Sequence, residues 1–190
     1  MNWQPVARWI SIAGHPFVWL LIYVGVVAFA HLPWPQALLA VGLVFFLSIL
    51  PMTLYLQRLV RGGATNFDVS KQELRGPVYA LGLALGLFLL WVFRRLGTPW
   101  EMLRGLVAGI VMVVTASLIN LRLKVSLHSA FAVWVACGLW RYSPWMSVGA
   151  GCGALAVIWS RLELGRHTVS ELVAGMALGA IMSVPLQWGP

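Results

Sequence analysis

The residues with the clearest chemical pattern lie near the C-terminal end. Ser160 and Arg161 are followed after five residues by His167 and after three more by Glu171. The four-residue spacing predicts that His167 and Glu171 share one helix face, where the carboxylate holds one imidazole nitrogen and leaves the other nucleophilic. Arg161 offers a planar fork of donors for phosphate oxygens, and a helix N-terminus beside His167 favours an anion. These four residues, the third of three polar clusters along the chain, therefore predict a phosphate site.

Two other polar clusters carry complementary groups. The second cluster contains Lys124, Ser126 and His128, which supply a point charge, a hydroxyl donor and a second imidazole. The first cluster, near residue 70, contains Lys71 and Arg75. Together the three clusters contain the groups that binding and cleaving a phosphate ester requires.

The elements that must position these groups are membrane helices. Hydrophobic residues make up 61% of the 190 residues and charged residues only 9%, against about a quarter in soluble domains. Apolar stretches near the length of a membrane crossing lie at 10–30, 36–56, 78–93, 103–119, 126–140, 145–159 and 168–187. The alternating pattern of barrel strands is absent. We expect an all-α fold, a polytopic transmembrane helical bundle of six or seven helices that forms one domain over residues 1–190.

The order of the stretches predicts that the three clusters meet. Two apolar stretches, separated by a break at 94–99, lie between the first and second clusters, and two more, separated at 141–144, lie between the second and third. Each pair returns the chain to the membrane face that it left. The three clusters are therefore expected on one face of the membrane.

Tryptophans and glycines support a helical membrane protein. Nine of the eleven tryptophans are expected at the membrane interfaces: Trp3, Trp9, Trp34, Trp91, Trp100, Trp140, Trp145, Trp159 and Trp188. Three glycine pairs at four-residue spacing predict close helix packing: Gly82 with Gly86, Gly105 with Gly109, and Gly175 with Gly179.

The net charge of +8 does not indicate a nucleic-acid partner, because the charges lie in short connections and helix ends instead of an extended basic face. We expect the bilayer and a phosphorylated lipid as partners. Two site histidines without a third ligand at suitable spacing predict no metal site, and no cofactor is expected. His15 and His31 are interpreted as interfacial residues. Nothing in the sequence indicates an oligomeric state.

The three clusters resemble the motifs of the type 2 phosphatidic acid phosphatase superfamily, membrane lipid phosphatases that share their site with the soluble vanadium haloperoxidases. The family motifs are Lys-x6-Arg-Pro, Pro-Ser-Gly-His and Ser-Arg-x5-His-x3-Asp. Ser160, Arg161 and His167 match the third motif, in which Glu171 replaces the aspartate. The resemblance covers roughly residues 65–185.

The other two motifs depart from the family pattern. Val125 and Leu127 replace the proline and glycine of the second motif around Ser126 and His128. In the first motif Arg75 matches, but Asp68 occupies the lysine position and the proline is displaced to Pro77. Lys124 or Lys71 is the candidate to supply the missing cation. The chain is thus interpreted as a divergent branch.

The resemblance implies a metal-independent phosphatase acting on a lipid phosphomonoester or diphosphate through a phosphohistidine. In this mechanism His167 attacks phosphorus and His128 serves as acid and then base. Arg75, Arg161, Lys124 or Lys71, and Ser126 bind the phosphate, and Glu171 orients the nucleophile. Phosphatidate, phosphatidylglycerophosphate, polyprenyl phosphates or diphosphates and lipid A phosphates remain open as substrates. The alternative is a non-catalytic lipid-phosphate binding or transport protein of the same fold.

We expect a multi-pass protein of the plasma (inner) membrane of a bacterium or archaeon. On a seven-helix count the motif face carries nine lysines and arginines against four on the other face. Removing the candidate phosphate ligands Lys71, Arg75, Lys124 and Arg161 leaves five against four, because chemistry and not insertion places those charges. The face of the membrane that holds the site is therefore left open.

Overall fold

The computed structural model describes residues 2–63, 69 and 74–188, and the regular elements in these ranges are all helices. The elements are α1 (Gln4–Ala13), α2 (Pro16–His31), α3 (Trp34–Val44), the π-helical turn η1 (Phe45–Ile49), α4 (Leu50–Arg61), α5 (Arg75–Arg95), α6 (Trp100–Ile119), α7 (Leu127–Gly138), the 3-10 turn η3 (Leu139–Arg141), α8 (Pro144–Glu163), α9 (Val169–Ser183) and the 3-10 turn η4 (Val184–Gln187). The prediction of an all-helical fold is confirmed.

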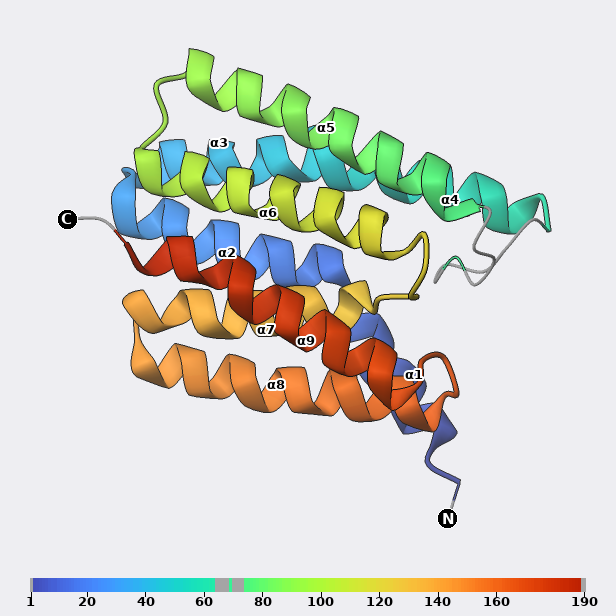
Figure 1. Ribbon diagram of the computed structural model, residues 1–190. Helices are drawn as coiled ribbons and strands as arrows, with labels where there is room; N and C mark the ends of the chain where they lie inside the picture. Colours follow the sequence, from blue (N-terminus) through green and yellow to red (C-terminus); the bar gives the residue numbers. More distant parts are fainter. Residues whose placement is uncertain (1, 64–68, 70–73, 189–190) are drawn as a thin grey trace.

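The helices from α2 to α9 run side by side, with α3, η1 and α4 forming one continuous helix and the chain reversing direction at the short connections α2–α3, α5–α6, α6–α7, α7–α8 and α8–α9 (Figure 1). The connections α2–α3, α5–α6 and α7–α8 lie at one end of the bundle. The C-terminal end of α4, the N-terminal end of α5 and the connections α6–α7 and α8–α9 lie at the other end. Arg75 of the first cluster and the second and third clusters lie at that second end, as the order of the apolar stretches predicts.

Four helices are long and apolar enough to cross a membrane: Trp34–Arg61, which joins α3, η1 and α4, then α5, α6, and Val169–Gln187. The α1–α2 pair, bent by 42°, raises the number to five if it forms one span. The predicted six or seven crossings are not confirmed. Helix α7 has only 12 residues, about 18 Å of helix against a hydrocarbon core of about 30 Å. Helix α8 has the length, but carries glycine, serine and charged residues.

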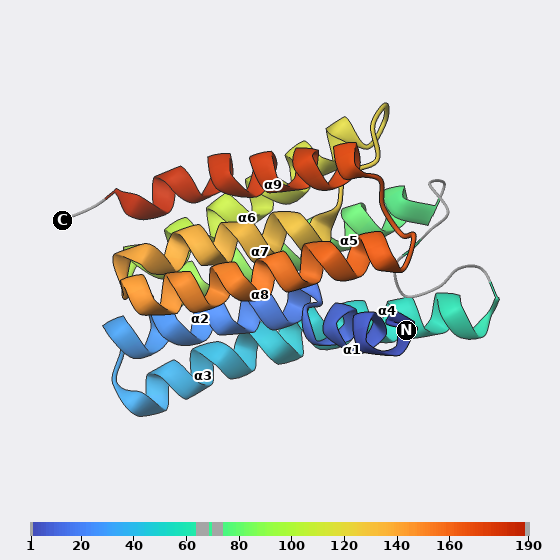
Figure 2. The ribbon, with the colours of Figure 1, turned by 90° about the horizontal axis from the view of Figure 1, so that it is seen from below.

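Helix α7 lies in the middle of the bundle and packs against α2, α8 and α9 (Figure 2). Nine of its twelve residues are buried. Its composition is apolar because it contacts protein on nearly every side. The sequence pattern alone does not separate such a helix from one that faces lipid.

The tryptophans fall into an exposed group and a buried group. All nine that were assigned to the interfaces are exposed, from Trp159 at 37% to Trp145 at 84%. The remaining two, Trp19 and Trp134, are buried in the core. Exposed indole rings near helix ends fit the headgroup region of a bilayer, where an amphipathic ring contacts both lipid and water.

The glycine pairs have different surroundings. A Cβ added at Gly175 or Gly179 would collide with backbone atoms of α7, so α7 and α9 approach as closely as predicted. Gly82 and Gly109 instead line a cavity, and a Cβ at Gly109 would meet nothing within 4 Å. The prediction of close packing is confirmed for the α7–α9 contact and is wrong for Gly109.

Candidate active site

The candidate nucleophile lies directly before helix α9. Thr168 caps this helix, and its Oγ1 accepts a hydrogen bond from the Glu171 N–H at 3.4 Å. Glu171 Oε2 accepts hydrogen bonds from the Thr168 N–H at 3.3 Å and from His167 Nδ1 at 2.8 Å. The predicted His167–Glu171 contact is therefore present, although His167 is not part of the helix. A capping box, not a shared helix face, brings the two side chains together.

This hydrogen bond determines how His167 can react. With its Nδ1 proton donated to the carboxylate, the neutral ring carries its lone pair on Nε2. The His167 side chain is 8% exposed, and burial lowers its pKa from 6.5 to about 4, a shift that Glu171 opposes and that the positive charges of Arg161 and Lys124 reinforce. At neutral pH the ring is uncharged and oriented as a nucleophile requires.

Lys124 connects the second cluster to the third. Its Nζ donates a hydrogen bond to the Arg166 carbonyl oxygen at 2.9 Å and lies 3.8 Å from Glu171 Oε2. Lys124 therefore holds the α8–α9 connection and the orienting carboxylate. It is not among the residues that line the cavity described below.

Ser126 is fully buried and caps helix α7. Its Oγ accepts a hydrogen bond from the Ser129 N–H at 3.4 Å, and its own N–H donates to the Glu171 carbonyl oxygen at 3.3 Å. Ser126 thus joins the N-terminal ends of α7 and α9. This junction places His128, the second residue of α7, beside His167.

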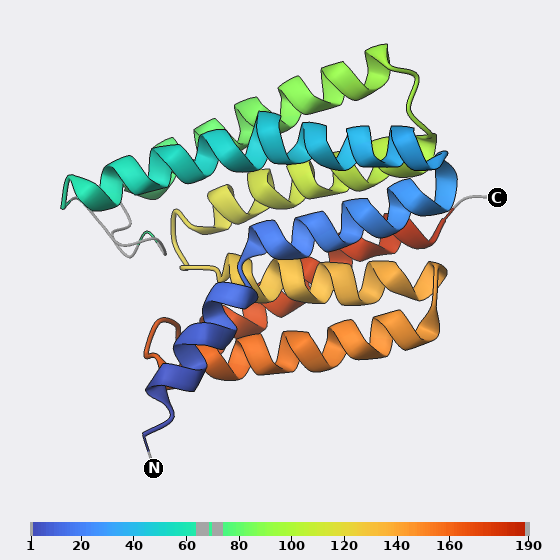
Figure 3. The same ribbon diagram turned by 180° about the vertical axis from the view of Figure 1, so that it is seen from behind.

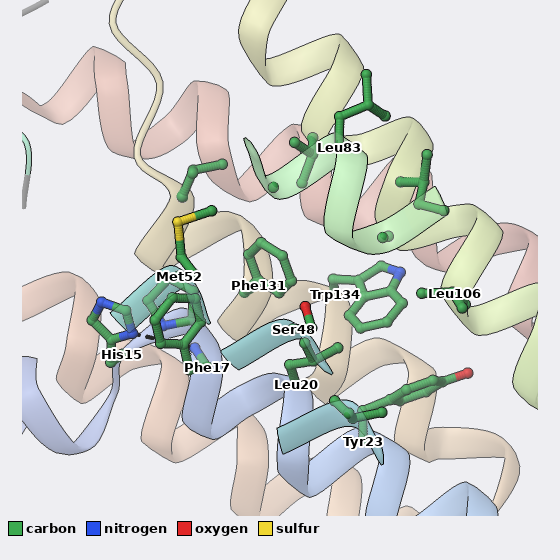
Figure 4. Close-up of a pocket in the computed structure, with 18 of the residues that line it drawn as sticks. His15, Phe17, Leu20, Tyr23, Ser48, Met52, Leu83, Leu106, Phe131 and Trp134 are labelled. Carbon is green, nitrogen blue, oxygen red and sulfur yellow. Dashed lines mark hydrogen bonds between the residues drawn. The ribbon is translucent and has the colours of Figure 1, made fainter. Parts of the chain in front are cut away.

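A cavity of about 230 Å³ joins the candidate residues. At one end its wall contains the polar side chains His15, Arg75, His128, Arg161 and His167. The rest of the wall is almost entirely apolar and continues along the inside of the bundle. In Figure 4, His15 and Phe17 lie near one end of the labelled side chains, and Tyr23 and Leu106 lie toward the other. A polar head and an apolar chain could occupy such a cavity together.

The two arginines in the cavity wall are buried and held by specific acceptors. Arg161 is 1% exposed and its Nη1 donates to Ser11 Oγ at 2.7 Å. Arg75 donates from Nε to the Val69 carbonyl oxygen at 3.0 Å and from Nη1 to Asn120 Oδ1 at 2.7 Å. Fixed guanidinium groups at the end of a cavity can bind the oxygens of a phosphate.

Sequence reasoning missed three residues of this site: Ser11, Asn120 and His15. The first two orient the arginines, and their positions in apolar or short connecting segments carried no pattern that distinguishes them. His15, interpreted from sequence as interfacial, lies in the cavity wall with its ring centroid 5.3 Å from that of His128. Its position between Gly14 and Pro16, two residues that favour a break in a helix, was the available sequence sign of a bend at His15.

Four of the eight predicted site residues line the cavity: Arg75, His128, Arg161 and His167. The side chains of Lys124, Ser126 and Glu171 do not line the cavity, but contact the helix ends and the connection that carry His128 and His167. Lys71 lies outside the described residues, as does Asp68 at the lysine position of the first motif. Within the described ranges no group of three or more His, Cys, Asp or Glu side chains is placed to hold a metal ion.

Comparison of the chain with protein-family models, curated proteins and solved structures gave no match.

Proposed function

We propose that the protein is a metal-independent membrane phosphatase that hydrolyses a phosphomonoester or diphosphate of a lipid through a phosphohistidine. The observation that carries this proposal is the 2.8 Å hydrogen bond from His167 Nδ1 to Glu171, at the end of a cavity that also contains His128 and two buried arginines. This arrangement supplies an oriented nucleophile, an acid or base and an anion site.

In the first step His167 Nε2 attacks phosphorus as the bond from phosphorus to the lipid oxygen breaks. His128 acts as an imidazolium ion and gives a proton to the leaving oxygen, so that His128 becomes neutral and, from a phosphomonoester, a neutral lipid alcohol departs. Arg75 and Arg161 stabilise the charge on the non-bridging phosphoryl oxygens. Glu171 stabilises the positive charge that develops on the attacking imidazole.

In the second step water attacks the phosphohistidine. His128, now neutral, accepts a proton from this water as the P–N bond breaks, which releases inorganic phosphate and regenerates His167. The two histidines therefore end the cycle in their starting protonation states. Lys124 acts in this scheme by holding Glu171 and the α8–α9 connection.

The lipid nature of the substrate is supported by the apolar wall of the cavity, which begins at the polar end and runs along the bundle interior. An acyl or polyprenyl chain can bury its surface there while the phosphate contacts the arginines. Phosphatidate, phosphatidylglycerophosphate and polyprenyl phosphates all fit this description. We place the protein in the plasma membrane of a bacterium or archaeon, with six or seven helices embedded in the bilayer.

The second candidate function is binding or transport of a lipid phosphate without turnover. The buried arginines and the apolar cavity would serve that function equally well. The His167–Glu171 pair favours hydrolysis, because a binding site has no need for an imidazole held in its nucleophilic tautomer.

The test is phosphate release from a panel of lipid phosphates by purified protein in detergent. Wild type should release phosphate from at least one lipid, and both His167→Ala and His128→Ala should lower that rate by roughly 10²-fold or more. His31→Asn, at the other end of α2, is the matched control. If the wild type binds lipids but releases no phosphate from any of them, the binding protein is the correct function.

A further inference from the structure

We propose that His15 is a positioning residue that fixes the ring of the acid and base His128. This inference rests on the proposed function and adds a third histidine to its site. The His15 and His128 rings meet edge to face, with centroids 5.3 Å apart and planes at 84°. Both rings lie in the wall of the same cavity.

Local structure holds His15 firmly in place. His15 caps helix α2: its Nδ1 accepts a hydrogen bond from the Phe17 N–H at 3.3 Å, drawn as a dashed line in Figure 4. Its ring also packs on that of Phe17, with centroids 4.4 Å apart. Because Nδ1 is the acceptor, the neutral ring carries its proton on Nε2. The position and the tautomer of His15 are thus set by the start of α2.

The bend that carries His15 is anchored to the helix that carries Arg161. Helix α1 crosses the bundle at an angle and lies along the end of α8 (Figure 3). A Cβ at Gly14 would collide with the Val157 side chain, one helical turn before Arg161. Ser11 accepts a hydrogen bond from Arg161 itself. The α1–α2 bend is therefore held against the active-site end of α8, and His15 with it.

The contact has a chemical consequence for His128. An edge-to-face contact restricts the rotation of an aromatic ring, and proton transfer requires the donating nitrogen to point at the leaving oxygen. Among the residues that the structure describes, the charged or titratable groups in the cavity wall near His128 include Arg75 and Tyr79 from α5, Arg161 from α8 and His167 from the α8–α9 connection. The two arginines and His167 bind or attack the phosphate, whereas His15 contacts the ring of the acid. His15 therefore positions the ring of His128 by a ring contact, as Glu171 positions the ring of His167 by a hydrogen bond.

The experiment uses His15→Asn, because an asparagine side chain can still cap α2 but has no ring to contact His128. His31→Asn is the matched control, since His31 also makes an edge-to-face contact, with Tyr142, at the other end of α2. First-turnover release of the leaving group is measured for dodecyl phosphate and for 4-nitrophenyl phosphate. The alkyl ester needs a proton on its leaving oxygen, whereas the nitrophenolate leaves without one.

His15→Asn should lower the first-turnover rate on dodecyl phosphate by roughly 10-fold, which is less than the 10²–10⁴-fold lost when a general acid is removed altogether. The rate on 4-nitrophenyl phosphate should stay within about twofold of wild type. In a His128→Asn background, His15→Asn should cause no further loss on dodecyl phosphate. Equal losses of rate on both substrates, or no loss on either, would overturn the role of His15. The proposed function would still stand in that case if the wild type is active and its activity depends on His167. A wild type inactive on both substrates and on the lipid panel would overturn the proposed function itself.

Discussion

The close approach of α7 and α9 makes Gly175 a position where one added methyl group should be harmful. A Cβ at Gly175 would collide with Ser129 Oγ and with the Ser126 carbonyl oxygen, and would lie 3.3 Å from the Ser126 carbonyl carbon. Two of these atoms are backbone, and Ser129 Oγ is held by hydrogen bonds to the carbonyls of Ser126 and Leu172 at 3.0 and 3.2 Å. Gly175→Ala can therefore be accommodated only if the two helices separate, by on the order of 1 Å.

The matched control is Gly151→Ala in α8, where a Cβ would meet nothing within 4 Å. Both substitutions gain about 1 kcal/mol of helix propensity, but overpacking costs Gly175→Ala about 1–3 kcal/mol. We expect Gly175→Ala to have the lower Tm in detergent. Since His128 and His167 lie on the separated elements, a shift of about 1 Å should also lower phosphate release by up to roughly 100-fold. Equal Tm and equal activity for the two variants would refute the argument that this contact positions the site.

Three further predictions concern the charged groups of the site. Glu171→Gln keeps the capping box, so its Tm should stay near that of wild type while phosphate release falls by roughly 10³-fold; a fully active variant would contradict the orienting role of the carboxylate. A ¹⁵N spectrum of histidine-labelled protein should show His167 titrating at the lowered pKa of about 4. A titration midpoint at the ordinary value of 6.5 would contradict the burial of this ring. Because the unfolded chain takes up this proton at a higher pH than the folded protein, the free energy of unfolding should also fall as the pH drops from about 6.5 to about 4. Ser11→Ala removes a hydrogen bond from the buried Arg161 and should cost about 1.5–3 kcal/mol of stability, whereas Ser117→Ala, which loses only a bond to Val114 O within α6, should have a smaller effect on Tm.

The helical architecture could be predicted from sequence because membrane burial acts on each segment by its own composition. Each of the seven apolar stretches is mostly helical, although the first is broken at Gly14 and His15, and the nine tryptophans expected at the interfaces are exposed. The number of crossings could not be predicted in the same way. Helix α7 is apolar because α2, α8 and α9 surround it, a property of its neighbours and not of its own sequence.

In the candidate site too, contacts between residues close in the chain could be predicted and contacts between distant segments could not. The spacing of His167 and Glu171 predicted their contact, since residues so close in the chain meet through local geometry. The roles of Ser11 and His15 depend on the bend at Gly14 and on a helix about 145 residues further along the chain, which local spacing does not encode. Lys124 was predicted at the site and lies there, but it contacts Glu171 instead of the cavity.

The central claim, nucleophilic attack by His167, is tested most directly by trapping the covalent intermediate. His128→Asn should still be phosphorylated by 4-nitrophenyl phosphate, whose leaving group needs no proton, but it lacks the base for hydrolysis. Mass spectrometry of the alkali-quenched variant should therefore find a phosphoryl group on His167, absent when His167→Ala is added. Stoichiometric release of 4-nitrophenol without a phosphoryl group on His167 would contradict the mechanism.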